Sequence, residues 1–412
     1  MMRRRLDRRQ FGQAAGATLA WWSVHQPLGA WAQQAKAQGP NAAEFIPGKD
    51  PRLLAHNTKV GEIETPLPLL RDYAITPPTL LFVRSNQPLA DSLSLEPAPL
   101  AGWTVEFHGL LNSNRTLAAV ELAALPAVER ELVLQCSGNG RAFFSRAAQA
   151  DGVQWQHGAM GNVRFRGATL ASVLQHLGLE VQPTAKFVAM EGADAPAETG
   201  AADFEHSIPL ADALERSILA WEMNGQPLPR VHGGPVRFVT PGFYGTMHVK
   251  WLRRLRFEAE ESRNYHHVGR YRTPRRPITP GSPFHSNLAN SDPNWNMKLK
   301  SVIFAPLGKD PIQTGVVPVR GVAWNDGTTR ITAVELSQDN GQTWSAAELT
   351  VPDSPYAWHP WQAEVRLAAG KHTLQCRAID AAGQTQPQDG SIAWNPAGYA
   401  WNGVDRVEIQ VS

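Results

Sequence analysis

The pattern of the chain changes near Lys300, and this change constrains the fold more than any other feature. Before Lys300, apolar segments with the two-residue period of strands alternate with segments typical of helices. After it, only short strand-like segments remain, separated by turn signals such as Asp339-Asn340-Gly341. Mixed strands and helices predict an α+β or α/β domain, and regularly spaced short strands predict a β-sandwich.

The 412 residues leave room for two or three domains of about 150 residues each. We expect a mixed domain over residues 76–270, a connection over 271–300 and a sandwich over 301–412. Residues 33–75 show no sustained periodicity and are expected to form an arm that wraps around the protein or extends from it. In the mixed domain the expected strands are 80–84, 103–111, 130–136, 186–192, 235–242 and 249–257, and the expected helices are 116–125, 168–177 and 209–225. In the sandwich the expected strands are 316–324, 331–337, 361–367, 371–380 and 406–412.

Residues 1–32 are typical of a removable export signal. A basic start is followed by the mildly apolar stretch 12–22 and by Ala30-Trp31-Ala32, a small-x-small site suited to signal peptidase. The stretch Asp7-Arg8-Arg9-Gln10-Phe11 resembles the twin-arginine motif, which directs folded proteins out of the bacterial cytoplasm. The alternative is a basic disordered tail. The signal predicts a periplasmic protein.

The charge of the mature chain argues against a polyanionic partner. Removal of residues 1–32 takes away five arginines and one aspartate and changes the formal charge from +2 to about −2. This balance gives no support to binding of nucleic acid or of an anionic membrane surface. No further apolar run of about 18 residues predicts a membrane span.

Cys136 ends the strand-like segment 130–136, and three roles are open for it. It could form a disulfide with Cys376, the only other cysteine. Against this, Cys376 shares one strand face with Leu374 and Ala378, as a small buried thiol in a sandwich core would. It could be a nucleophile, but no local motif supplies a base and an orienting partner. It could be a ligand to a redox-active transition metal that takes its other ligands from an organic cofactor.

The residues after Cys136 favour the metal-ligand role. Gly138 and Gly140 let backbone amides approach a bulky group closely. Arg141 can place a guanidinium over an anion bound at the metal. Arg146 is a weaker candidate for the same task, since an arginine there is more often a solvated surface residue.

At this point the chain resembles a known family. "LQCSGNGRAFF", at residues 134–144, is similar to the cysteine loop of the sulfite oxidase family of molybdenum enzymes. Four further segments are similar to the same family, and the likeness spans residues 76–412. They are "TLLFVRSNQP", "GAMGNVRFRGATLASVL", "AWEMNGQPLPRVHGGPVRFVTPGFYGTMHVKWL" and "VELSQDNGQTW".

The resemblance implies a fold and a cofactor. It implies an α+β architecture, with a mixed α/β molybdopterin-binding domain followed by an immunoglobulin-like domain that mediates dimerisation. It implies one molybdenum-molybdopterin per chain, with Cys136 as the single protein ligand to the metal. The cofactor-binding residues that it implies are Phe82, Val83, Arg84, Ser85, Asn86, Cys136, Asp194, His232, Arg237, His248, Val249 and Lys250.

The resemblance also implies an activity, which is oxygen-atom transfer that converts sulfite to sulfate. Arg84, Cys136 and Arg141 are the implied catalytic residues, with the two guanidinium groups holding the oxyanion. The sequence has no Cys-x-x-Cys-His motif, so we expect no covalent haem on this chain. Electrons are therefore expected to pass to a periplasmic c-type cytochrome, either as a separate protein or as a subunit of a heteromer, with a homodimer as the other expected assembly.

Two positions depart from the family pattern. Asn86 stands where many members have a pocket histidine, and Phe204 stands where the family usually has an active-site tyrosine, a hydroxyl that Tyr244 could replace. These changes leave two alternatives to a sulfite dehydrogenase. One is a related molybdenum enzyme that acts on protein-bound sulfane sulfur, a sulfoxide or another oxyanion. The other is a binding protein that has lost catalysis.

Overall fold

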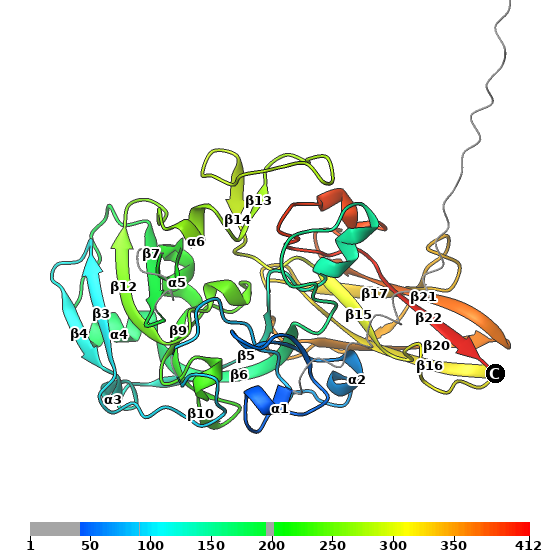
Figure 1. Ribbon diagram of the computed structural model, residues 1–412, viewed down its shortest axis with the longest axis horizontal. Coiled ribbons are helices and arrows are strands. Elements are labelled where there is room, and N and C mark those ends of the chain that lie inside the picture. The colour runs from blue at the N-terminus through cyan, green and yellow to red at the C-terminus, as the bar shows by residue number, and fades with distance from the viewer. Residues whose placement is uncertain (1–41, 90, 195–201) are drawn as a thin grey trace, which may run out of the picture. The chain divides into compact units, whose positions relative to one another are not determined.

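The first domain is built on two five-stranded sheets that share one apolar core (Figure 1). The computed structural model describes residues 42–89, 91–194 and 202–412, so the predicted export signal lies outside the described residues. One sheet has the strand order β4-β3-β12-β7-β8, and the other has the order β10-β9-β6-β5 with β11 paired to β9. The strands of the first sheet are β3 (Thr104–Gly109), β4 (Arg115–Ala118), β7 (Phe187–Gly192), β8 (Glu205–Pro209) and β12 (Leu252–Glu258). Those of the second are β5 (Ala127–Gln135), β6 (Met160–Thr169), β9 (Ile218–Met223), β10 (Gln226–Pro227) and β11 (Arg237–Val239).

Short helices connect these strands. They are α3 (Ala119–Leu122), α4 (Leu170–His176), α5 (Leu210–Arg216) and α6 (Tyr265–Val268), with 3-10 turns η3 (Arg141–Arg146), η4 (Arg230–His232) and η5 (Gly245–Met247). α4 begins where the Thr169 hydroxyl accepts a hydrogen bond from the Ser172 amide at 3.1 Å, and the chain turns away at Gly178, whose φ is +62°. Leu170, Val173 and Leu174 point into the core.

Two predicted helices are wrong in part. The segment 209–225 forms only α5, and the chain then becomes the strand β9, which lies between β6 and β11. The segment 116–125 begins as the strand β4, in which Leu117 is fully buried opposite Val105, and only then forms α3. In both cases pairing with a neighbouring strand overrides a local helix preference.

The predicted arm wraps around the first domain where the structure describes it. It contains α1 (Ala42–Phe45), β1 (Leu54–Asn57), β2 (Glu62–Glu64) and α2 (Leu67–Leu70). Ile46, Leu53 and Ile63 pack in one apolar cluster with Val83. The predicted strand 80–84 makes only an isolated bridge between Val83 and Ile63.

The predicted connection has structure of its own. It contains a hairpin of β13 (Arg272–Pro274) and β14 (Ser291–Pro293), which projects at the top of Figure 1. Tyr271, at its start, is buried.

The last part of the chain is the predicted β-sandwich, with sheet orders β15-β16-β20-β19 and β18-β17-β21-β22. Its elements are β15 (Lys300–Ala305), β16 (Gly315–Trp324), β17 (Ile331–Ser337), β18 (Ser345–Ala346), β19 (Glu348–Leu349), β20 (His359–Leu367), β21 (Gly370–Asp380), η6 (Gly390–Ala393) and β22 (Asp405–Val411). Leu374, Cys376 and Ala378 lie together in the core between the sheets, as predicted. Asn340 and Gly341 both have positive φ values, 63° and 83°, and lie in the loop 338–344 that joins the antiparallel strands β17 and β18, so the predicted hairpin forms with a longer loop than a two-residue turn.

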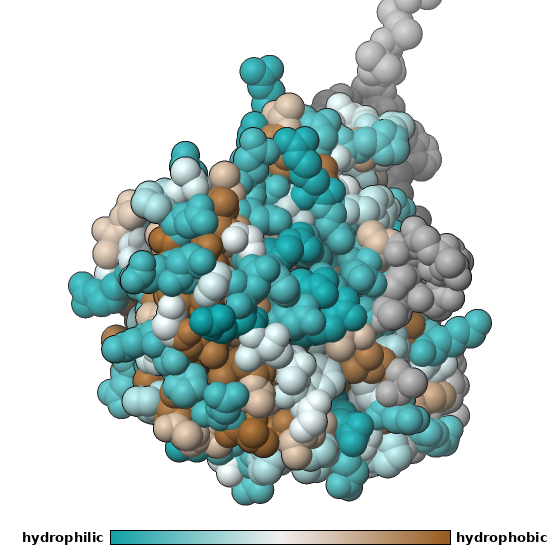
Figure 2. Space-filling view, turned by 90° about the vertical axis from the view of Figure 1, so that its left-hand side faces the viewer, coloured by the Kyte–Doolittle hydropathy of each residue, from teal (hydrophilic) through white to brown (hydrophobic). Residues whose placement is uncertain are grey.

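The side of the molecule that carries β3 and β4 is mostly hydrophilic, with smaller hydrophobic patches between the polar residues (Figure 2). No helix within the described residues is long and apolar enough to span a membrane.

The sandwich core provides a stability prediction. Val334 on β17 is fully buried, whereas Val316 on β16 is 52% exposed. We expect Val334→Ala to lower the free energy of unfolding by about 2 kcal/mol, because it removes buried methyl groups and leaves a cavity. Val316→Ala is the matched control and should change it by less than about 0.5 kcal/mol. Denaturant titration of both variants measures the difference, and equal losses would contradict the assigned burial.

Candidate active site

Cys136 lies at the end of β5, where the strand opens into the glycine loop. Its amide donates to the carbonyl of Ala159 at 2.9 Å, and the Gly138 amide lies 3.4 Å from its Sγ. The thiol is buried, at 6% exposure, and both cysteines are free, so the disulfide alternative does not hold. Cys376 instead donates its thiol hydrogen to Ser301 in the sandwich core at 3.3 Å.

The glycines of the loop make room for protein side chains. A Cβ on Gly138 would lie 2.4 Å from the Arg141 guanidinium, and a Cβ on Gly140 would lie 2.6 Å from the Trp401 ring. Gly140 also has a φ of +90°, which favours glycine. The loop sequence therefore fixes the position of Arg141 and the packing of the sandwich domain against the cysteine.

An inner cavity opens on one side of Cys136. Its lining residues are Phe82, Arg84, Ser85, Asn86, Leu134, Cys136, Asp194, Phe204, His232, Arg237, Gly245, Thr246, His248, Lys250, Trp251 and Tyr271. The structure thus brings together nearly all the residues predicted to bind a cofactor. Two of them do not line the cavity: Val83 and Val249 pack into neighbouring apolar clusters.

Two cationic side chains that form no ion pair within the described residues are buried at this cavity. Lys250 donates to the Ser85 hydroxyl at 2.9 Å and to the Val231 carbonyl at 2.8 Å, and Arg237 donates to the carbonyls of His232 and His248 at 2.9 and 3.1 Å. Neither makes an ion pair with a carboxylate of the described residues. Burial lowers the pKa of Lys250 well below its usual value and that of Arg237 to about 9. An anionic ligand between these side chains would relieve this cost.

Asp194 supplies a hydrogen-bond acceptor to the same cavity. Its Oδ1 is buried without a hydrogen-bond partner among the described residues, and burial raises the pKa of its carboxyl to about 7. An unpartnered buried oxygen is an acceptor for the N–H groups of a ligand. The donor set at this cavity therefore fits a ligand that carries both an anionic group and ring or amino N–H donors, as a pterin phosphate does.

An outer cavity lies on the other side of Cys136. It is lined by Glu62, Arg84, Cys136, Arg141, Asp151, Gly152, Val153, Gly269, Arg270, Tyr271, Arg272, Pro274, Phe284, Ser286, Asn395, Pro396, Ala397 and Tyr399. Arg84, Cys136 and Tyr271 line both cavities, so the thiol lies where the two meet. A group bound in the inner cavity can there reach a small molecule that enters through the outer one.

Two guanidinium groups are held rigidly at this junction. Arg84 pairs with Glu62 at 3.1 Å. Arg141 donates through Nε to Ala397 and through Nη1 to Val153, both at 2.7 Å, and its guanidinium lies 5.5 Å from the centre of the Tyr399 ring. Arg146 lines neither cavity and instead lies over Trp401.

The two departures from the family pattern lie at the junction as well. Asn86 donates a hydrogen bond to the hydroxyl of Tyr271 at 2.8 Å, and Phe204 lines the inner cavity. Tyr244 is fully buried, accepts a hydrogen bond from the Lys298 amide and lines neither cavity, so it does not supply the expected hydroxyl. Tyr271 supplies it.

Tyr271 was missed because it begins the segment 271–300, which the sequence pattern marks only as a connection. The available signal was an aromatic residue between two arginines, Arg270 and Arg272. Its ring stacks on Tyr399, with ring centres 5.2 Å apart, and meets the edge of His206 at 5.2 Å.

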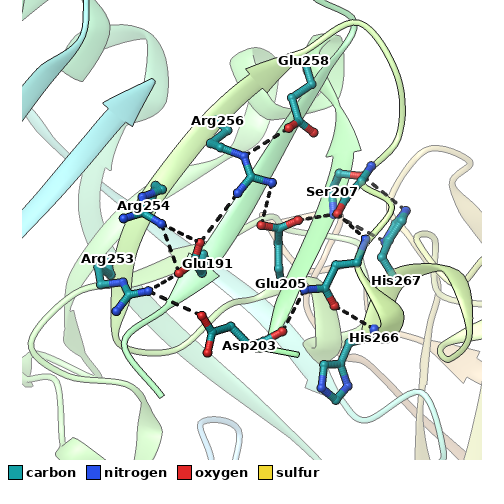
Figure 3. Close-up of polar contacts among 12 residues, drawn as sticks. Glu191, Asp203, Glu205, Ser207, Arg253, Arg254, Arg256, Glu258, His266 and His267 are labelled. Carbon is teal, nitrogen blue, oxygen red and sulfur yellow. Dashed lines mark hydrogen bonds and ion pairs between the residues drawn. The ribbon is translucent and has the colours of Figure 1, made fainter. Parts of the chain in front are cut away.

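A polar network anchors the elements next to Tyr271 (Figure 3). Glu205 on β8 pairs with Arg256 on β12 at 2.8 Å, and Ser207 lies 3.2 Å from the ring of His267 on α6. The ring of His267 also lies 3.0 Å from the carboxylate of Glu261. Glu261 in turn pairs with Arg272 at 2.8 Å. The network thus ties β8, β12 and α6 to the residue that follows Tyr271.

No three His, Cys, Asp or Glu side chains gather into a metal-binding group within the described ranges.

Comparison with known proteins agrees with this geometry. Residues 94–266 match the oxidoreductase molybdopterin binding domain, and residues 291–412 match the Mo-co oxidoreductase dimerisation domain. The chain is 33% identical to human mitochondrial sulfite oxidase over 376 residues, which cover 89% of this chain and 67% of that protein. It is also 33% identical to the barley nitrate reductase [NAD(P)H] over 376 residues, which cover 84% of this chain and 40% of that protein.

A solved structure shares the whole fold. The sulfane dehydrogenase SoxCD from Paracoccus pantotrophus matches with a TM-score of 0.72 at 24% identity, over 98% of this chain and 96% of that one. The thiol between a cationic inner cavity and an arginine-lined outer cavity agrees with these matches. The chain belongs to the sulfite oxidase family of molybdenum oxidoreductases.

Proposed function

We propose that this protein is a periplasmic sulfite dehydrogenase that passes electrons to a c-type cytochrome. The observation that carries the proposal is the position of Cys136, whose sulfur lies where the cationic inner cavity meets the outer cavity with Arg84 and Arg141. The overall reaction is SO₃²⁻ + H₂O → SO₄²⁻ + 2H⁺ + 2e⁻. When bound, the molybdenum cofactor supplies the two-electron oxygen-atom transfer chemistry.

The inner-cavity residues would hold the cofactor. Lys250 and Arg237 provide positive charge for the phosphate, Asp194 provides an acceptor for pterin N–H groups, and Cys136 provides a thiolate for the metal. His232 and His248 line the same cavity.

The outer-cavity residues would bind and orient sulfite. The fixed guanidinium groups of Arg84 and Arg141 attract a small dianion and limit the directions from which it approaches the sulfur of Cys136. Because Asn86 donates to the oxygen of Tyr271, the phenol hydrogen is free to point at an oxygen of the bound anion. Together these groups place the substrate and keep its negative charge paired.

A second substrate class is favoured by one observation. Asn86, which lines the inner cavity, stands where many relatives have a histidine and donates to Tyr271, which lines both cavities, so the polar surroundings where the cavities meet differ. A molybdenum oxidoreductase acting on protein-bound sulfane sulfur, the activity named for SoxCD, or on a sulfoxide is therefore the alternative. The assembly that we propose is a homodimer through the dimerisation domain or a heteromer with a cytochrome subunit, without a haem on this chain.

Metal analysis together with an assay tests the activity. We expect about one molybdenum per chain in the exported protein, and sulfite-dependent reduction of cytochrome c or ferricyanide. Cys136→Ser should lower turnover at least about 100-fold, because the metal loses its protein ligand. Cys376→Ser, in the sandwich core, is the matched control and should retain activity. If the protein contains molybdenum but does not oxidise sulfite, the alternative substrates are favoured. If the protein contains no molybdenum when it is made in a host that synthesises the cofactor, the proposal is contradicted.

The role of Tyr271 gives a second prediction. Tyr271→Phe removes the hydroxyl that Asn86 orients and should lower kcat/KM for sulfite about 10- to 100-fold, the effect of losing one hydrogen bond to a charged group. Tyr244→Phe is the matched control, since that hydroxyl lines neither cavity. Steady-state kinetics of both variants compare the two, and an unchanged kcat/KM in Tyr271→Phe would remove Tyr271 from the site.

The location can be tested through the signal. Conversion of both Arg8 and Arg9 to Lys should leave the precursor in the cytoplasm, because the twin-arginine pair is the part of the signal that the exporter reads. Conversion of Arg3 and Arg4 to Lys is the control and should leave export intact. Cell fractionation with detection of the mature chain measures both, and normal export of the first variant would argue for another route.

A further inference from the structure

Lys49 is a buried lysine of the arm, and no pattern in the sequence singles it out. It lies between α1 and β1 and is 2% exposed. Its Nζ lies 2.5 Å from the carbonyl oxygens of Pro78 and Leu81 and 3.1 Å from Nε2 of His232. No carboxylate of the described residues pairs with it. One ammonium group therefore ties the arm and the segment before Phe82 to a residue that lines the inner cavity.

With a charged Lys49, the three contacts place the proton of His232 on Nδ1. An ammonium group has three hydrogens to donate and no lone pair, so a contact with each of three acceptors uses all of them. Pro78 and Leu81 accept two, and the third requires a lone pair on Nε2 of His232. A neutral imidazole with an acceptor at Nε2 carries its hydrogen on Nδ1.

His232 is kept neutral by its surroundings. Burial lowers its pKa well below the usual value, and the positive charges of Lys49, Lys250 and Arg237 lower it further, while a hydrogen bond to the backbone of Pro78 acts in the opposite direction. The only donor that such a ring can offer to a ligand in the inner cavity is the Nδ1–H. An acceptor group of a pterin would be recognised by this donor.

We propose that Lys49 is a positioning residue for the cofactor: it holds His232 as a neutral imidazole with its hydrogen on Nδ1, so that His232 donates a hydrogen bond to the bound pterin. This inference rests on the proposed function only in placing a pterin in the inner cavity. The competing arrangement has an uncharged Lys49, which burial favours by lowering its pKa, and a hydrogen on Nε2 of His232. The two arrangements differ in a directly measurable way.

The tautomer of His232 is the first test, and it needs no functional variant. The cofactor-loaded protein is labelled with ¹⁵N-histidine, and the His232 signals are assigned from their loss in His232→Gln. We expect a protonated Nδ1 and an unprotonated Nε2. A hydrogen on Nε2, or on both nitrogens, would overturn the proposal. The sulfite assay is separate: lack of sulfite turnover with the expected tautomer would count against the substrate and leave the role of Lys49 in place.

Cofactor retention is the second test. Lys49→Met should release molybdenum and pterin about tenfold faster than the parent protein during dialysis, the effect of one charge-assisted contact. Lys59→Met is the matched control, because Lys59 is an exposed lysine of the same arm. In a His232→Gln background, Lys49→Met should add little further loss, because its effect passes through His232. An additive loss in the double variant would show that Lys49 only supports the arm, and would refute the positioning role.

Discussion

Buried positive charge that forms no ion pair with a carboxylate of the described residues is the constraint around which the site is arranged. Arg237 and Lys250 line the inner cavity, and Lys49 lies directly behind it. Backbone carbonyls and hydroxyls accept their hydrogen bonds, but these groups carry no full negative charge. The folded chain is therefore built to be completed by an anion, and the molybdopterin phosphate is an anion of the required kind.

The residues around this buried charge come from segments that are far apart in the sequence. Lys49 comes from the arm, Ser85 from the segment after the isolated bridge, and Lys250 from the turn before β12. Ser85 and Lys250 line the cavity, whereas Lys49 reaches it only through its contact with His232.

The sandwich domain builds one wall of the outer cavity. Ala397 accepts from Arg141, and the Ala400 amide donates to the Ser137 carbonyl in the cysteine loop at 2.8 Å. Trp401 packs edge-on against Phe144 in the turn that follows that loop. The position of the arginine that would face the substrate thus depends on both domains.

The sequence by itself determined the α+β class, the sandwich and the position of the cysteine loop, because strand periods and glycine turns are local signals. The residues expected to bind the cofactor were implied by the family resemblance, and the fold brings nearly all of them to one cavity. Tertiary structure alone decided that Ile218–Met223 is a strand, since its pairing partners lie far away in the sequence. It also decided which tyrosine lies where the two cavities meet: Tyr271 lies in an irregular segment and is positioned by contacts with Asn86 and Tyr399. The burial of Lys49 could not be predicted either, because a lysine between two short elements is typical of a surface residue. Only the fold places it against His232.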